Sequence, residues 1–273
     1  MKVFRLIVLV CILCSSGFSQ TDGRVIFQRA MSELESHDLD AAMTSFREFL
    51  AISPNDPAGN YNLGLCYYQR QEYERAIPAF RNAIKTKADF AEAYIYLGNS
   101  LDYLNKHELA MDAYKKALGY EPSNARVYEE MGVALEKQKN YEEAARSFQK
   151  AADLDKSGFT NFRALAKAYY NSGNFVAAIP AYKQAIALDP QNATNQLYLA
   201  YALVKTQRFM DSIAAFNAVI ALRPTDAYAI NGLGGAYLEM GNIAMAKKQH
   251  GVLVNLNKDL AAKLLLRIRA AKH

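Results

Sequence analysis

The sequence contains few of the residues from which metal sites and catalytic pairs are built. It has three cysteines, four histidines and no tryptophan in 273 residues. The histidines, at positions 37, 107, 250 and 273, are far apart, and we find no carboxylate or cysteine beside them at the spacing of a metal ligand. Cys66 also has no histidine at a catalytic spacing. We therefore expect no catalytic residue, no metal and no cofactor, and we expect the protein not to be an enzyme.

Charge of one sign is also scarce. The 32 lysines and arginines nearly balance the 27 aspartates and glutamates, which gives a net charge of +5, and no long block of like charge occurs. Nucleic-acid binding depends on a dense basic surface that neutralises phosphates. Because the sequence lacks such a basic stripe, we expect no nucleic acid among the partners.

A long hydrophobic run is missing as well. The most apolar segment, Leu6 to Cys14, has nine residues, whereas a membrane span needs about 20. Lys2 and Arg5 precede this segment and the small residues 15–17 follow it, which is the pattern of a secretory signal peptide. We predict that residues 1–19 are a signal peptide cleaved before Gln20, so that no integral membrane span remains. An uncleaved membrane anchor is the alternative.

Cleavage at this point would remove two of the three cysteines. Cys66 would then have no partner for an intramolecular disulfide. The short positively charged start, the lone cysteine and the helical pattern described below together favour an exported protein of the bacterial periplasm or cell envelope.

What the sequence does contain is a period of 34 residues. An aromatic residue or histidine recurs at this interval, at Phe46, Phe80, Tyr114, Phe148, Tyr182, Phe216 and His250. A small residue recurs four positions before each of them, at Ala42, Ala76, Ala110, Ala144, Ala178, Ser212 and Ala246. Residues four apart share one face of a helix. Self-similarity at such a fixed interval is the signature of a stacked repeat array.

If the aromatic residue is taken as position 24, the repeats begin at Gly23, Pro57, Ala91, Ala125, Phe159, Ala193 and Ala227. Position 8 is then always small, as Ala30, Gly64, Gly98, Gly132, Ala166, Ala200 and Gly234. Such a small residue lets a second helix approach closely. Proline falls at position 32 in four repeats and ends the second helix, because the residue before a proline is pushed out of helical geometry.

This pattern resembles that of the tetratricopeptide repeat (TPR) family over residues 23–257. The resemblance implies an all-α fold, a right-handed superhelical α-solenoid of seven helix–turn–helix units. Residues 258–273 depart from the pattern and are predicted to form an amphipathic capping helix, with Leu260, Leu264 and Ile268 at helical spacing. A peripheral contact of this basic helix with anionic lipid is the alternative.

The resemblance also implies which residues face a ligand. In TPR proteins the first helix of each repeat lines a concave groove, and positions 2, 5, 6, 9 and 12 tend to face the ligand. Carried onto this sequence, these positions predict a peptide-binding groove formed by Phe27, Tyr61, Asn62, Tyr68, Ile95, Tyr96, Asn99, Glu129, Arg163, Lys167, Tyr170, Tyr198, Tyr201, Tyr228 and Asn231. Tyrosines are good anchors because they combine a large apolar area with a polar tip. We expect some of them to pack between helices instead.

The predicted function is that of a non-enzymatic scaffold that binds an extended protein segment in this tyrosine-rich groove. The charges favour a ligand with oppositely charged stretches, because Glu129 belongs to the fourth repeat and Arg163 and Lys167 belong to the fifth. Two alternatives stay open. The chain could be a self-assembling structural scaffold, or it could be an accessory subunit of an envelope enzyme or assembly machine.

Overall fold

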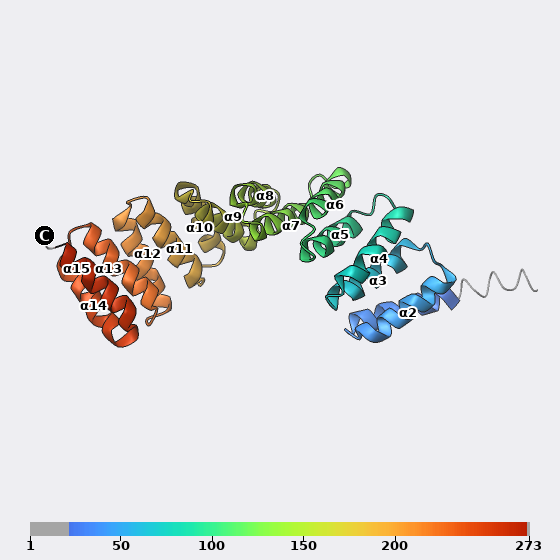
Figure 1. The fold of residues 1–273 in the computed structure, drawn as a ribbon, viewed down its shortest axis with the longest axis horizontal. Helices are drawn as coiled ribbons and strands as arrows, with labels where there is room; N and C mark the ends of the chain where they lie inside the picture. Colours follow the sequence, from blue (N-terminus) through green and yellow to red (C-terminus); the bar gives the residue numbers. More distant parts are fainter. Residues whose placement is uncertain (1–21, 272–273) are drawn as a thin grey trace, which may run out of the picture. The chain divides into compact units, whose positions relative to one another are not determined.

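The computed structural model describes residues 22–271. The predicted signal peptide, residues 1–19, lies outside the described residues, as do the last two residues of the predicted capping helix. Within residues 22–271 every regular element is a helix, which confirms the all-α fold class (Figure 1). No helix in this part of the chain has the length and apolar character that crossing a membrane requires.

Helices follow one another in pairs at the interval of the repeat. Residues 22–35 form the first helix. The remaining helices are α2 (Leu39–Ile52), α3 (Pro57–Gln69), α4 (Tyr73–Thr86), α5 (Ala91–Tyr103), α6 (His107–Tyr120), α7 (Ala125–Lys137), α8 (Tyr141–Leu154), α9 (Phe159–Asn171), α10 (Phe175–Leu188), α11 (Ala193–Lys205), α12 (Phe209–Leu222), α13 (Ala227–Glu239), α14 (Ile243–Leu256) and α15 (Lys258–Ala270). The odd-numbered helices from α3 to α13 begin at the residues with which the second to seventh repeats begin in the sequence.

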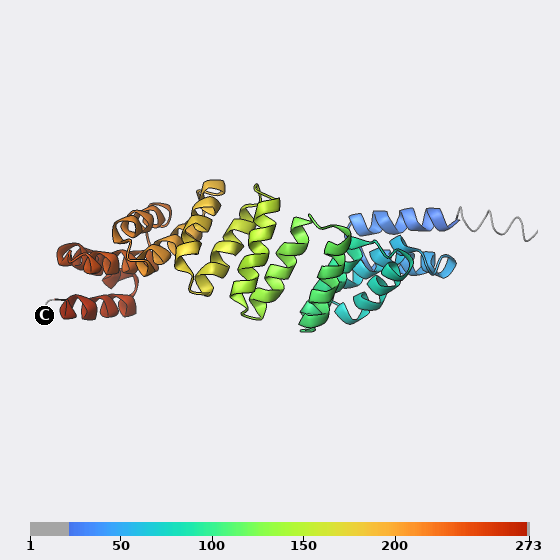
Figure 2. The ribbon, with the colours of Figure 1, turned by 90° about the horizontal axis from the view of Figure 1, so that it is seen from above.

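The chain divides into two compact units, with the boundary between Glu130 and Met131 inside α7. In unit 1, helices α2 to α6 each pack on the next, and the first helices α3 and α5 also touch each other. In unit 2, the same succession runs from α8 to α14, and the first helices α11 and α13 touch. Figure 2 shows the antiparallel course of the paired helices within each unit.

The core is built from the two residue series that carry the period. Phe80 and Phe148 are fully buried, as are the alanines four positions before them. Gly64, at position 8, faces the ring of Phe80 so closely that an added Cβ would lie 2.7 Å from the ring carbon Cε1. Gly98 stands in the same relation to Tyr114, at 2.5 Å. The small residue at position 8 therefore leaves room for the aromatic ring of its own repeat.

The turn inside each repeat contains a residue with a positive φ, which the residue types at that position do not predict. Position 15 has a positive φ in all seven repeats, with values from 57° to 81° at His37, Gln71, Asn105, Lys139, Gly173, Gln207 and Gly241. A left-handed residue at this point ends the first helix and reverses the chain. Only two of the seven are glycines, so five other side chains adopt a conformation that they rarely occupy.

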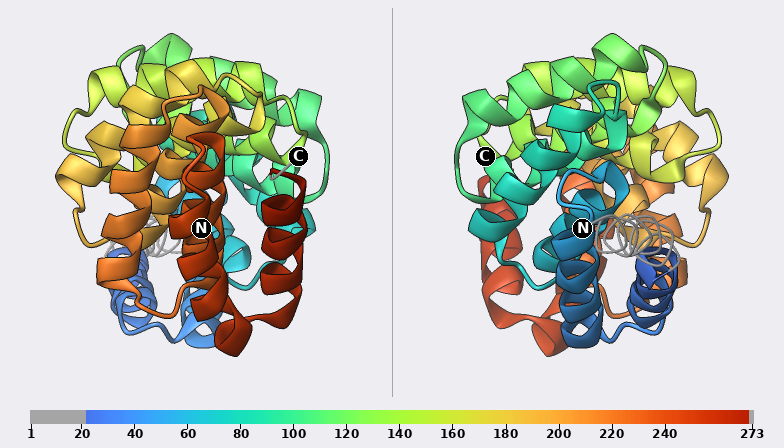
Figure 3. Two further views of the ribbon diagram at one scale, coloured as in Figure 1. Left: turned by 90° about the vertical axis from the view of Figure 1, so that its left-hand side faces the viewer. Right: turned by 90° about the vertical axis from the view of Figure 1, so that its right-hand side faces the viewer.

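Helix α15 covers the end of unit 2, where it packs on α13 and α14 (Figure 3). Its buried residues Ala261, Leu264 and Ile268 join one hydrophobic cluster with Ile230 and Leu253. The helix therefore buries the apolar face of the last repeat, which has no following repeat among the described residues to cover it.

We expect the central aromatic residue to matter more for stability than its counterpart in the last repeat. Phe148 is fully buried, so Phe148→Ala should lower the free energy of unfolding by about 3–5 kcal/mol. His250 is only half-buried, so His250→Ala should cost much less. Chemical denaturation of both variants measures the difference, and similar unfolding midpoints would contradict the repeat register.

Candidate functional site

The first helices of unit 1 bring predicted groove residues together. Tyr68 on α3 lies edge-on to Tyr96 on α5, with ring centroids 5.3 Å apart. Tyr61 approaches Tyr96 at 6.0 Å and Phe90 at 4.8 Å. Phe80 from α4 stacks on Tyr96 at 5.8 Å. Side chains from α3, α4 and α5 thus form one continuous set of aromatic contacts.

Two further tyrosines complete this set, although the family positions did not predict them. Tyr73, at the start of α4, and Tyr103, at the end of α5, stack in parallel at 4.5 Å. Both also contact Tyr68. They lie at positions 17 and 13, outside the five family positions. The only sequence signal for them is that both are tyrosines, the residue type that dominates the predicted groove. We call Tyr61, Tyr68, Tyr73, Phe80, Tyr96 and Tyr103 the unit 1 cluster.

An arginine that the sequence analysis overlooked lies against this cluster. The guanidinium of Arg126 lies over the ring of Tyr96, 4.9 Å from its centroid. It also pairs with Glu92 at 3.0 Å and with Glu130 at 3.8 Å. Glu92 and Glu130 are therefore partly neutralised within the protein, and the acidic character expected beside Glu129 is weaker than a count of carboxylates suggests. Glu129 itself is half-buried.

Unit 2 contains a second set of aromatic contacts. Tyr170 on α9 lies edge-on to Phe175 at 5.1 Å and to Tyr198 at 5.3 Å. Tyr198 in turn stacks on Tyr182 at 6.2 Å. We call Tyr170, Phe175, Tyr182 and Tyr198 the unit 2 cluster. Beside it, Lys167 pairs with Glu136 at 2.7 Å.

The last predicted tyrosines lie one repeat further along. The hydroxyl of Tyr201 donates a hydrogen bond to the backbone carbonyl of Tyr228, 3.1 Å away, and its ring packs edge-on to Phe216. Tyr228 is exposed, and Asn231 is half-buried. Tyr201 therefore links α11 to α13 as well as forming part of the surface.

Three predicted groove residues are buried. Ile95 is fully buried. The side-chain amide of Asn62 donates to the carbonyl of Ala58 at 2.9 Å, and the side-chain oxygen of Asn99 accepts from the Tyr114 hydroxyl at 2.6 Å. These side chains pack between helices. Phe27, which is half-buried, packs edge-on to Phe46 at 5.8 Å. Arg163 and Lys167 are exposed.

Burial raises the pKa of four of the predicted groove tyrosines. It raises the pKa of Tyr61, Tyr68 and Tyr170 above the usual value, and it raises the pKa of Tyr201 to about 12. Their hydroxyls therefore remain hydrogen-bond donors at neutral pH. Because the folded pKa lies above the unfolded one, the stability that these groups contribute is complete below about pH 10 and is lost as the pH rises through the folded values.

The two tyrosines at position 24 differ in their hydrogen bonds. The Tyr114 hydroxyl bonds to Asn99, which is at position 9 of the same repeat. At Tyr182, position 9 is Lys167, and the buried Tyr182 hydroxyl has no hydrogen-bond partner in the structure. A buried polar group without a partner costs free energy, and a native protein seldom keeps one without a reason.

This difference predicts that replacing tyrosine by phenylalanine changes the free energy of unfolding differently at the two positions. Tyr114→Phe should lower the free energy of unfolding by about 1–3 kcal/mol, because it leaves the buried oxygen of Asn99 without its donor. Tyr182→Phe should leave the free energy of unfolding unchanged or raise it. Denaturant titration of both variants tests the assignment, and equal losses of stability would contradict it.

Cys66 belongs to the core of unit 1. Its side chain is fully buried, and burial raises the pKa of the thiol to about 11. The reactive thiolate is therefore rare at neutral pH. Within residues 22–271 no group of three or more histidine, cysteine, aspartate and glutamate side chains is arranged to hold a metal ion.

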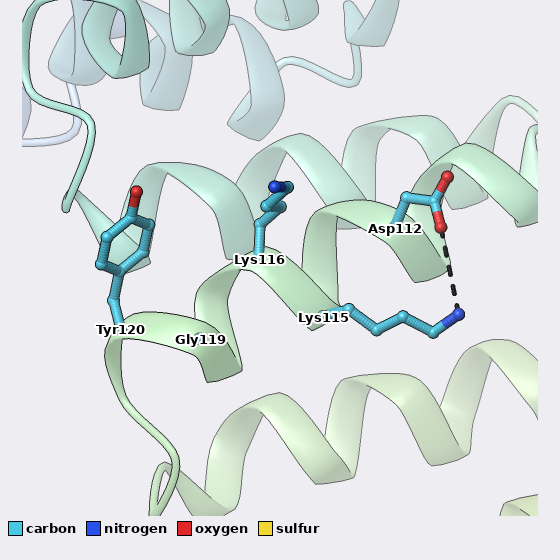
Figure 4. Close-up of a pocket in the computed structure, with 5 residues that line it drawn as sticks. All are labelled: Asp112, Lys115, Lys116, Gly119 and Tyr120. Atoms are coloured by element: carbon cyan, nitrogen blue, oxygen red, sulfur yellow. Dashed lines mark ion pairs between the residues drawn. The ribbon is translucent and has the colours of Figure 1, made fainter.

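Two shallow depressions are lined by other residues. One lies along α6 and is lined by Asp112, Lys115, Lys116, Gly119 and Tyr120 (Figure 4). In Figure 4, Lys115 reaches toward Asp112, at 4.0 Å, and both side chains are largely exposed. The other is lined by Gln207, Arg208, Phe209, Met210, Asp211 and Met240. The charged groups on α6 remain hydrated, so this depression lacks the desolvated polar groups typical of ligand sites.

Comparison with protein families gives one consistent result. The family described as Tetratricopeptide repeat matches residues 27–93, 95–158, 163–227 and 197–246. Among curated proteins, Tetratricopeptide repeat protein 13 of Homo sapiens is 31% identical over 81 residues, which are 30% of this chain. That match spans only 9% of the human protein.

Solved structures of similar fold are TPR proteins too. YrrB, described as a TPR protein with an unusual peptide-binding site, has a TM-score of 0.61 and 24% identity, over 68% of this chain and 96% of its own. The C-terminal part of a TPR repeat-containing protein from Cytophaga hutchinsonii has a TM-score of 0.75 and 18% identity, over 88% of this chain and 99% of its own. At these identities the likeness concerns the fold alone.

Proposed function

The chain belongs to the tetratricopeptide repeat family, and from this premise we propose that it is a non-enzymatic scaffold of the bacterial envelope that holds an extended protein segment against the tyrosines of its first helices. The TPR fold binds protein or peptide partners. The observation that carries the proposal is the aromatic cluster in each unit, where half-buried tyrosines converge from neighbouring first helices.

The mechanism is rigid presentation of anchoring side chains. The rings contact one another edge-on and in stacks, so their rotamers are fixed before a ligand arrives. A ligand that meets fixed rings loses conformational freedom, while the protein loses little. Tyrosine adds a hydroxyl to each ring, and this hydroxyl can bond to the backbone of an extended segment. The peptide-binding site described for YrrB supports this mode of binding for the fold.

The test removes the same anchor from both units. Tyr68→Ala combined with Tyr170→Ala takes the central ring out of each cluster. Lys115→Ala combined with Val176→Ala, at exposed positions outside the clusters, is the matched control. After cross-linking in the native cell envelope, wild type and control should capture the same proteins, and the tyrosine variant should lose them although its circular dichroism stays helical.

Retention of the captured proteins by the tyrosine variant would contradict binding at the clusters. Sedimentation of the purified chain over a range of concentrations tests the self-assembly alternative, because a mass that grows with concentration favours it. An enzyme that co-purifies and depends on the clusters would favour the accessory-subunit alternative.

The envelope location rests on the signal-peptide pattern of residues 1–19. We expect the protein purified from its native cells to begin at Gln20 and to be released with the periplasmic fraction. N-terminal sequencing checks this directly. A chain that still begins at Met1 and remains with the cytoplasmic fraction would contradict the location.

A further inference from the structure

The two aromatic clusters are one arrangement that occurs twice. Tyr68, Tyr73, Phe80 and Tyr96 of unit 1 have their counterparts three repeats later in Tyr170, Phe175, Tyr182 and Tyr198 of unit 2. The edge-on contact between positions 12 and 6 measures 5.3 Å in both units, at interplanar angles of 77° and 75°. The stacked contact between positions 24 and 6 measures 5.8 Å and 6.2 Å.

The residues around the two clusters differ in a consistent way. Position 5 is Tyr61 in unit 1 and Arg163 in unit 2. Position 9 is Leu65 in unit 1 and Lys167 in unit 2. Position 13 of the following repeat is Tyr103 in unit 1 and Lys205 in unit 2. Three uncharged side chains are thus replaced by three cations around the same aromatic frame.

Two of these three positions border the cluster in unit 1. In unit 1, Tyr61 contacts both Phe80 and Tyr96, and Tyr103 contacts both Tyr68 and Tyr73. Arg163 and Lys205 occupy the equivalent positions of unit 2, and both side chains are exposed. Lys167 reaches Glu136, whose charge acts on Tyr182.

The fourth difference is the Tyr182 hydroxyl, which replaces a hydrogen of Phe80. The Tyr182 side chain is 1% exposed, and its hydroxyl has no partner. Its ring stacks on Tyr198 of the first helix α11, and Tyr198, Tyr170 and Glu136 act on it electrostatically. Burial, followed by these neighbours, raises its pKa, and the group therefore stays a neutral donor.

We propose that the unit 2 cluster is an anion-specific subsite, which takes an aspartate or glutamate side chain of an extended polypeptide between Tyr182, Lys167, Arg163 and Lys205. The carboxylate accepts the hydrogen bond that Tyr182 cannot make within the protein, and the cations provide charge complementarity. The unit 1 cluster, which carries uncharged residues at these three positions, suits an apolar or aromatic side chain.

Lys167 is free to change partner. Its side chain is 57% exposed, whereas that of Glu136 is 21% exposed. The long, flexible stem of lysine allows the ammonium group to turn from Glu136 to a carboxylate of the ligand. Arg163 and Lys205 are exposed as well, so neither residue has to leave a buried position to reach the ligand. This inference rests on the proposed function, because it names the chemistry of the segment that the scaffold holds.

The first experiment selects ligands without assuming their identity. Phage-displayed random peptides of about ten residues, long enough when extended to pass one cluster, are selected on the full wild-type chain. We expect the selected peptides to be enriched in aspartate and glutamate. Enrichment in lysine and arginine, or no preference for charge, would overturn the proposal.

The second experiment converts the unit 2 cluster into its unit 1 counterpart. The substitutions Arg163→Tyr, Lys167→Leu and Lys205→Tyr introduce residues that the fold already carries at the equivalent positions. Binding of a selected acidic peptide, measured by fluorescence anisotropy, should weaken at least about tenfold and lose most of its dependence on salt. Tyr182→Phe alone should weaken binding by about five- to tenfold. An affinity unchanged in both variants would overturn the proposal.

Two controls separate this proposal from the proposed function. Tyr114→Phe removes a hydroxyl that is already bonded within the protein, and it should leave the peptide affinity unchanged. Peptides that need Tyr68 and Tyr170 but ignore the three cations would refute the anion subsite and leave the scaffold function intact. Peptides whose binding depends on none of these residues would refute both.

Discussion

The fit between the aromatic ring at position 24 and the small residue at position 8 is the contact on which the rest of the structure depends. Where position 8 is glycine, as at Gly64, a single added Cβ would overlap the ring of Phe80. This contact sets the distance between the two helices of a repeat. Gly64, Gly98 and Gly132 all make this contact with the ring of their own repeat, and side chains of successive first helices, such as Tyr68 and Tyr96, meet.

The fold therefore uses one set of positions for stability and leaves another for recognition. Phe80 and Tyr182 occupy the same position, and both are buried, but their rings also form the inner wall of the tyrosine clusters through Tyr96 and Tyr198. A core residue thus supports a surface tyrosine in each unit. This support fixes the surface ring, which is the condition for binding with little loss of conformational freedom.

The charged residues around the two aromatic clusters differ. In unit 1 the chain itself supplies a cation, because Arg126 lies on Tyr96 and pairs with two glutamates. In unit 2 three cations occupy positions that are uncharged in unit 1, and the buried Tyr182 hydroxyl has no hydrogen-bond partner. The same aromatic frame thus occurs twice with residues of different charge around it.

The sequence by itself determined the repeat, the residues at which the first helices of the second to seventh repeats begin, and the buried series from Phe46 to Phe216. A period of 34 residues places the same residue types at the same packing positions in every repeat. The sequence could not determine which side chains at the family positions are exposed. Ile95 and Asn99 are buried because neighbouring helices cover them. Only the tertiary structure joined Tyr73 to Tyr103 and Arg126 to Tyr96, and only it left Tyr182 without a partner, since each of these depends on residues brought together from different helices.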